Sequence, residues 1–98
     1  MCYKIIWLNQ AIEELKEIRH YIEVIEEAPE SAATLTTKIY EAASSLSFMP
    51  ERFQKDSQRP KYRRMMVLST YSIFYQIKGT VVYIAHIWNS ARDKSNLR

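Results

Sequence analysis

Two segments in the first half of the chain carry apolar residues at alternating steps of three and four positions. In the first segment these residues are Ala11, Leu15, Ile18, Ile22 and Ile25, and in the second they are Ala32, Leu35, Ile39, Ala42 and Leu46. This spacing is typical of an amphipathic helix whose apolar face packs on a core. Pro29 lies between the segments and ends the first helix near Glu27, because a residue that precedes proline disfavours helical geometry. The second helix begins at Pro29 or Ser31.

Residues beside the two helices fit their ends. Asn9 is a favoured N-cap residue and precedes the first helix. Glu30 lies in the first turn of the second helix, where a carboxylate complements the positive end of the helix dipole. The connection between the helices is short, so we expect them to run antiparallel as a hairpin. The glutamates expected on the solvated faces of the first helix are Glu13, Glu14, Glu17, Glu23 and Glu26.

Other segments are rich in the β-branched and aromatic residues that favour strands. Residues 3–8 form a short strand ahead of the first helix. Residues 63–77 form two strands joined at Ser69 and Thr70, and residues 81–88 form the last strand. Both faces of that last strand are apolar, which predicts a central position in the sheet.

Alternation along each strand assigns its side chains to the two faces of the sheet. Within residues 71–77, one face carries Tyr71, Ile73, Tyr75 and Ile77, and the other carries Ser72, Phe74 and Gln76. In the last strand, one face carries Val82, Ile84, His86 and Trp88, and the other carries Val81, Tyr83, Ala85 and Ile87. Tyr71 and Tyr75 are thereby expected to pack in the core, and His86 is expected to be a partly buried, hydrogen-bonded residue.

The order of the elements is β-α-α-β-β-β, which predicts an α+β fold with a helical hairpin packed on an antiparallel sheet. A length of 98 residues fits one domain, residues 1–98. Residues 51–61 are polar and are interpreted as a surface loop. Residues 89–98 are interpreted as a polar, basic C-terminal tail.

Charge is divided unequally along the chain. Residues 1–50 hold 4 Lys or Arg and 8 Asp or Glu, a net charge of −4, whereas residues 51–98 hold 10 and 3, a net charge of +7. A basic second half favours a polyanion or an acidic protein as its partner. The residues expected to contact such a partner are Arg59, Lys61, Arg63, Arg64 and Arg92. Arginine suits this role because its planar fork binds phosphate and carboxylate groups through two hydrogen bonds. The alternative for Lys61, Arg63 and Arg64 is a solvated strand end that keeps the sheet edge from aggregating.

Several classes of protein are excluded or disfavoured by what the sequence contains. The single cysteine, Cys2, cannot form an internal disulfide, which fits a reducing cytosol. Cys2, His20 and His86 show no familiar metal-ligand spacing, so no metal and no cofactor is expected. The first residues lack the features of a signal peptide, and no stretch approaches the roughly 20 apolar residues of a membrane helix.

Four pieces of the chain, taken in order, match one family. They are residues 7–15 with Ile18, Tyr21 and Ile22; residues 46–52; residues 71–77; and residues 82–87 with Ala91, Arg92 and Asp93. In order and spacing, these pieces make nearly the whole chain resemble the RelE/ParE superfamily of type II toxin–antitoxin toxins. The resemblance implies a small cytoplasmic toxin that forms a hetero-oligomer with a cognate antitoxin, by which it is neutralised. It also implies the same order of helices and strands.

The superfamily contains two mechanisms. RelE-like members cut mRNA on the ribosome, which requires a base for the 2′-OH, cations for the phosphate and an acid for the leaving oxygen. ParE-like members poison DNA gyrase and carry no such catalytic set. This sequence has Ser72 where the nucleases carry arginine, and Met65 where they carry lysine. Asn96 and Leu97 stand where a tyrosine or histidine is usual. The resemblance therefore favours the ParE side and inhibition of gyrase.

Two alternatives stay open at this point, and with them the question whether the chain is an enzyme. One is a ribosome-dependent endoribonuclease, with the ribosome and mRNA as partners. Its candidate catalytic residues are Arg63, Arg64, Arg92, His86 and Tyr62. The other is a non-toxic binding module, or a decayed toxin, that acts in a repressor complex. The antitoxin is expected either in a groove between the helical hairpin and the sheet or as an acidic segment over the basic strands.

Overall fold

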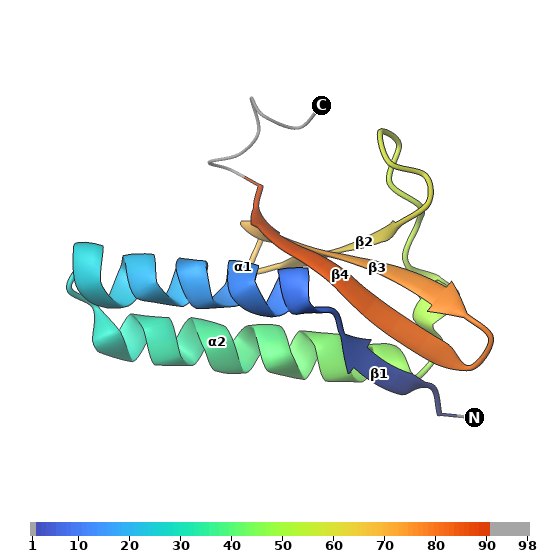
Figure 1. Cartoon of the computed structure of the whole chain (residues 1–98), viewed down its shortest axis with the longest axis horizontal. Helices are drawn as coiled ribbons and strands as arrows, with labels where there is room; N and C mark the ends of the chain where they lie inside the picture. Colours follow the sequence, from blue (N-terminus) through green and yellow to red (C-terminus); the bar gives the residue numbers. More distant parts are fainter. Residues whose placement is uncertain (1, 91–98) are drawn as a thin grey trace.

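A computed structural model describes residues 2–90 of the chain (Figure 1). The helices are α1 (Asn9–His20), which continues as a π-helix (Tyr21–Ile25), and α2 (Pro29–Ser44). The strands are β1 (Lys4–Trp7), β2 (Arg63–Val67), β3 (Tyr71–Lys78) and β4 (Val81–Asn89). Two 3₁₀ turns, Ser45–Ser47 and Pro50–Arg52, follow α2. The helical hairpin covers one face of the sheet, and this confirms the predicted α+β fold and order of elements (Figure 1).

The sheet has the strand order β1-β4-β3-β2, so β4 is central as predicted. Strands β2, β3 and β4 form an antiparallel meander. Strand β1 instead runs parallel to β4, from the pair Lys4 and Val81 to the pair Trp7 and Ile84. The sheet is therefore mixed, and the expectation of a wholly antiparallel sheet is wrong at this edge. The hairpin causes the difference because it carries the chain across one face of the sheet and frees β1 from the alternating directions of the meander.

The start of α1 differs from the expectation that Asn9 is its N-cap. Asn9 is the first helical residue, Leu8 holds the cap position, and no side chain caps the helix. The backbone N–H of Leu8 donates to the carbonyl oxygen of Ile84 at 2.9 Å. The chain thus enters α1 directly from the sheet pairing, and no turn is left in which a capping side chain can act.

The tip of the hairpin contains a change of helix type. Regular α-helix stops at His20, and the π-helix ends at Ile25, two residues before the expected end at Glu27. Glu27 has a φ of 52°, a left-handed conformation that stops the helix. The second helix begins at Pro29, as predicted.

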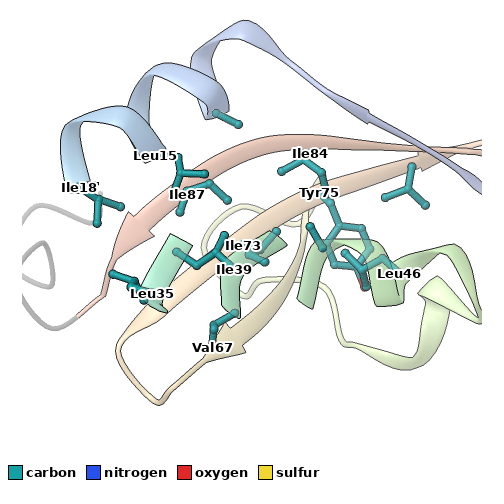
Figure 2. Packing of buried hydrophobic residues seen from close by; sticks show 13 residues of the cluster. Leu15, Ile18, Leu35, Ile39, Leu46, Val67, Ile73, Tyr75, Ile84 and Ile87 are labelled. Atoms are coloured by element: carbon teal, nitrogen blue, oxygen red, sulfur yellow. The ribbon is translucent and has the colours of Figure 1, made fainter. Parts of the chain in front are cut away.

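The core lies between the hairpin and the inner face of the sheet (Figure 2). Its fully buried side chains include Ile39 of α2, Ile73 and Tyr75 of β3, and Ile84 of β4. Each such side chain contributes about 1.5–3 kcal/mol by its removal from water. The hydroxyl of buried Tyr75 donates to the Pro50 carbonyl oxygen at 2.6 Å. Tyr71 packs against the same cluster, so the prediction that both tyrosines belong to the core is confirmed.

A β-bulge divides β4 into two parts. Tyr75 pairs with Ile84, while the preceding residue Phe74 pairs with His86, so Ala85 is left without a partner. An extra residue in one strand reverses which face the following side chains occupy. Ile87 therefore joins Val82 and Ile84 in the core, whereas His86 and Trp88 lie on the outer face. The prediction that His86 and Trp88 share a face with Val82 and Ile84 is wrong for this reason.

The β2–β3 turn holds two residues in a conformation that favours glycine. Leu68 and Ser69 have φ values of 55° and 60°, and the Thr70 N–H donates to the Val67 carbonyl oxygen at 3.2 Å. Positive φ at both central residues is the type I′ pattern, for which Asn-Gly is preferred. Leu68 is also 57% exposed, so its side chain contributes little burial in return.

We expect the double substitution Leu68→Asn and Ser69→Gly to raise the free energy of unfolding by ~1 kcal/mol, because it relieves strain in the turn. Urea denaturation followed by circular dichroism measures the change. Leu68→Ala is the control, since alanine shortens the side chain without favouring positive φ. An unchanged or lower urea midpoint for the double variant contradicts the assignment of strain.

Candidate functional site

The segment before β2 is fastened to that strand rather than solvated throughout. The Arg64 N–H donates to the Gln54 carbonyl oxygen at 3.2 Å, and the Asp56 N–H donates to the Tyr62 carbonyl oxygen at 2.8 Å. The nearly buried Asp56 carboxylate accepts the Arg59 N–H at 2.9 Å and pairs with the Arg64 guanidinium at 3.6 Å. The loop predicted at residues 51–61 is thus ordered by backbone pairing and by one buried carboxylate.

Alternation along β2 separates the arginines that were expected to act together. Arg63 pairs with Tyr75, and Arg64 pairs with Phe74. Tyr75 belongs to the core face and Phe74 to the outer face. The predicted cluster of Lys61, Arg63 and Arg64 is therefore divided between the two sides of the sheet.

The outer face carries a group of stacked rings and cations, which we call the outer-face cluster. Its members are Arg59, Tyr62, Arg64, Phe74, His86 and Trp88. The Tyr62 ring lies edge-on to the rings of Phe74 and His86, at centroid distances of 6.3 Å and 5.6 Å. The Arg59 guanidinium lies 4.7 Å from the Trp88 ring centroid, a distance typical of a cation–π contact. These contacts fix the basic loop onto the sheet.

Arg64 is held by several partners in the outer-face cluster. Its Nε donates to the Ser72 hydroxyl at 2.8 Å and its Nη2 to the Ser90 hydroxyl at 3.2 Å, and these two hydroxyls also contact each other. With the Asp56 pair, the guanidinium has partners on several sides, and its side chain is 32% exposed. Ser72 itself is fully buried beneath it. Ser72, which stands where RelE-like nucleases carry arginine, is thus covered by the guanidinium of Arg64 from β2.

Glu14 of α1 anchors the outer-face cluster from the edge of the sheet. Strand β1 pairs with β4 only as far as Ile84, so the edge of β4 has no neighbouring strand beyond that residue. The Glu14 carboxylate occupies this edge and accepts the Ile87 N–H at 3.0 Å and the Trp88 indole N–H at 2.8 Å. Both its oxygens lie 3.2 Å from Nδ1 of His86.

The role of Glu14 was missed in the sequence, where this residue was placed on a solvated face. Its side chain is only 14% exposed. The pattern contains a signal for this, because Glu14 lies three residues after Ala11 and four before Ile18, both of which are buried. A carboxylate at a position of the buried stripe requires hydrogen-bond donors from the sheet. His86 is half-buried and hydrogen-bonded, as expected, although its partner lies on a helix 72 residues away in the sequence.

The second basic surface is a groove beside β2 and the end of β3, with a volume of about 360 Å³. Its lining residues are Glu51, Lys55, Pro60, Lys61, Arg63, Tyr75, Gln76, Ile77 and Lys78, and we call it the basic groove. Of the predicted contact residues it contains Lys61 and Arg63. Lys55 and Lys78 were not predicted, because neither stands in a basic cluster of the sequence.

Two groups of the basic groove have shifted pKa values. Burial raises the pKa of Tyr75 to about 12, so its hydroxyl stays protonated and keeps its bond to Pro50. A hydrogen bond from the backbone N–H of Glu51 lowers the pKa of that carboxyl group, and the Tyr3 hydroxyl, which donates at 2.9 Å, adds to the effect. Neither group is suited to transfer a proton near neutral pH.

The remaining candidates are placed as follows. Arg92 lies outside the described residues. Cys2 is exposed. Within residues 2–90, no group of three His, Cys, Asp or Glu side chains is arranged to hold a metal ion. Over the same residues, no helix has the length and apolar character needed to cross a membrane.

Solved structures of toxin–antitoxin proteins share this arrangement of a helical hairpin on a four-stranded mixed sheet. A chain of the chromosomal ParDE toxin–antitoxin system from P. aeruginosa has a TM-score of 0.76 at 23% identity, over 90% of this chain and 96% of that one. A chain of the RelBE2 toxin–antitoxin complex from Mycobacterium tuberculosis has a TM-score of 0.62 at 20% identity, over 91% and 92%. The fold is therefore that of the RelE/ParE class of toxins.

Sequence comparison gives the particular family. The family model described as ParE toxin of the type II toxin–antitoxin system parDE matches residues 5–94. Because this match spans most of the 98 residues, the chain belongs to the ParE toxin family. The resemblance drawn from the sequence is confirmed, including its preference for the ParE side. A search of curated proteins finds no match.

We expect Glu14→Ala to lower the free energy of unfolding by about 2 kcal/mol, because it leaves the Ile87 and Trp88 N–H groups without their acceptor. It should also shift the fluorescence of Trp88, measured with Trp7 replaced by Phe. Glu14→Gln keeps one acceptor oxygen and should cost less.

The matched control for Glu14 is Glu13→Ala on the same helical turn, whose side chain is 65% exposed. It should change the free energy of unfolding by less than about 0.5 kcal/mol. Equal losses for the two alanine variants in urea denaturation would refute the anchoring role of Glu14.

Proposed function

We propose that this chain is the toxin of a type II toxin–antitoxin pair and that it arrests growth by poisoning DNA gyrase. The observation that carries the proposal is the match of residues 5–94 to the ParE toxin family. We further propose that it acts in the cytoplasm and is neutralised by a cognate antitoxin in a hetero-oligomer. The similarity in fold to chains from the ParDE system and the RelBE2 complex supports an antitoxin partner.

The arrangement of the outer-face cluster supports a toxin that binds rather than cuts. Met65 stands in β2 where RelE-like nucleases carry lysine, and its side chain packs against the core. Nδ1 of His86 is held by Glu14, and the imidazole ring lies nearly perpendicular to the Tyr62 ring at a centroid distance of 5.6 Å. Arg64 is held by Asp56, Ser72 and Ser90. Groups with this many partners serve as a fixed recognition surface for a protein target.

One observation favours the second candidate function, the ribosome-dependent endoribonuclease. The Arg64 Nε lies 2.8 Å from the Ser72 hydroxyl, so a guanidinium stands beside the position at which RelE-like nucleases carry arginine. In that reading Arg64 holds the scissile phosphate, and His86 or Tyr62 transfers the proton. Arg63 faces the other side of the sheet and would have no part in the reaction.

Induction of the toxin without antitoxin separates the two functions. We expect filamentation, a DNA-damage response and gyrase-linked DNA breaks, with mRNA left intact at ribosomal A-site codons. The measurements are microscopy, a damage reporter, mapping of covalent gyrase–DNA adducts, and primer extension on induced mRNA. Codon-specific mRNA cleavage without DNA breaks would establish the nuclease instead. Absence of any growth effect from a verified gene would favour the non-toxic binding module.

Substitutions in the outer-face cluster test which surface carries the toxicity. We expect Arg59→Gln with Arg64→Gln to reduce toxicity at least tenfold while the protein remains folded by circular dichroism. Lys16→Gln with Lys38→Gln removes the same charge from exposed positions on the two helices and should leave toxicity unchanged. Equal loss of toxicity in both variants would show that net charge, not the outer face, is responsible.

A further inference from the structure

We propose that the basic groove binds the phosphodiester backbone of nucleic acid, without cleaving it, through Lys55, Lys61, Arg63 and Lys78. This inference deepens the proposed function, and rests on it for its biological role, because it gives a toxin directed at a DNA enzyme its own contact with nucleic acid. The ligand class follows from the charge, the backbone pairing and the chemistry of the groove.

Charge is concentrated in the groove beyond what the fold requires. Four of its lining residues are cations and one, Glu51, is an acid. Lys55 and Arg63 are direct partners in an isolated antiparallel bridge, which places two like charges side by side. Such a pair is unfavourable between neighbouring strands unless an anion lies between the charges. The sequence thus keeps an arrangement that a bound anion would stabilise.

Arg63 is fixed where it faces the groove. Its Nη1 donates to the Phe53 carbonyl oxygen at 2.6 Å and to the Glu51 carbonyl oxygen at 3.2 Å. These carbonyls restrain the guanidinium, and the Glu51 carboxylate, whose pKa Arg63 helps to lower, offsets one of the four cations of the groove. Lys55 and Lys61 of the loop before β2 and Lys78 at the end of β3 line the groove with it as exposed residues. A fixed arginine with exposed lysines near it suits a ligand that carries several successive anionic groups.

Backbone pairing disfavours an acidic peptide as the occupant. Extended peptides usually bind by adding a strand to an open sheet edge. Here the edge of β2 beside the groove is already used, because Arg64 pairs with Gln54 and Tyr62 pairs with Asp56. A ligand must therefore be held by side-chain charges alone, which is how proteins hold the phosphates of nucleic acids independently of sequence.

The groove has the composition of a binding site rather than a catalytic one. The Tyr75 hydroxyl is protonated and donates to Pro50. The Glu51 carboxylate is ionised and accepts the hydroxyl of Tyr3. The other polar lining side chains are lysines, an arginine and Gln76. Within the described lining, the two groups with shifted pKa values are held by hydrogen bonds, and the other polar groups are cations and an amide, so we expect bound nucleic acid to stay intact.

The test is a direct binding measurement without gyrase or antitoxin. The probes are fluorescent 20-nucleotide oligo-dT, a 20-base-pair DNA duplex and 20-nucleotide oligo-U, at low and physiological salt. We expect the wild-type protein to bind at least one of them with an affinity that falls steeply with salt. The probe that binds most tightly shows whether the ligand is single-stranded DNA, duplex DNA or RNA. Gel analysis should show that the probe remains full length.

Lys55→Gln with Lys78→Gln is the test variant, since both residues are exposed and neither belongs to the outer-face cluster. We expect at least a tenfold loss of affinity and a reduction of the salt slope by about 2, about one for each lost phosphate contact. Lys16→Gln with Lys38→Gln should bind like the wild type. Thermal melting verifies that both variants fold.

Three results would overturn the inference. They are no binding at low salt, equal losses in the two double variants, and tighter binding of poly-glutamate than of any oligonucleotide. Because the assay contains no gyrase, a negative result leaves the induction experiment to decide the proposed function on its own. Gyrase poisoning by a protein that does not bind oligonucleotides would separate the two cleanly.

Discussion

The Glu14 carboxylate accepts hydrogen bonds at the edge of β4 where β1 no longer pairs with it, and the contact between α1 and the outer face depends on this carboxylate. Strand β1 ends opposite Ile84, whereas β4 continues to Asn89. The backbone N–H of Ile87 would otherwise face the helix without a partner, and a buried unpaired donor costs about 1–3 kcal/mol. Glu14 accepts that N–H and, with the same carboxylate, the indole of Trp88. Helix α1 is thereby bonded to the strand at the point where the sheet loses its edge partner.

The bulge at Ala85 determines which side chains of β4 lie on the outer face of the sheet. Without the extra residue, His86 and Trp88 would point into the core with Val82 and Ile84, and Ile87 would be exposed. The bulge instead places the rings of His86 and Trp88 on the outer face. There His86 contacts Tyr62, and Trp88 contacts Phe74. Arg59 and Arg64 then pack over those rings. One unpaired residue thus decides that a central strand supplies both the core and the basic surface.

The elements and the fold class could be predicted because periodicity is a local property of the sequence. Helical periodicity around Leu15 and Ile39 and strand alternation around Ile73 predict which face of each element is buried. The mixed sheet and the bulge could not be predicted in this way, and the helical stripe signals a buried Glu14 without identifying the strand edge that it binds. They depend on where β1 ends relative to β4, and no local pattern records that distance. The basic candidates were located in the right region. Alternation separates Arg63 from Arg64, but only the pairing of β2 with β3 shows which of the two lies on the core face.

The division of charge along the chain becomes a division in space. The hairpin contains most of the acidic residues, while the loop before β2 and the ends of the strands contain the basic ones. The two groups occupy opposite layers of the fold (Figure 1). The molecule is therefore an electric dipole as well as a net cation, and a dipole turns in the field of a polyanion before it makes contact. In such a field the basic side of the sheet faces the polyanion and the helices face away. The helical layer and the basic side of the sheet therefore present opposite charges in opposite directions.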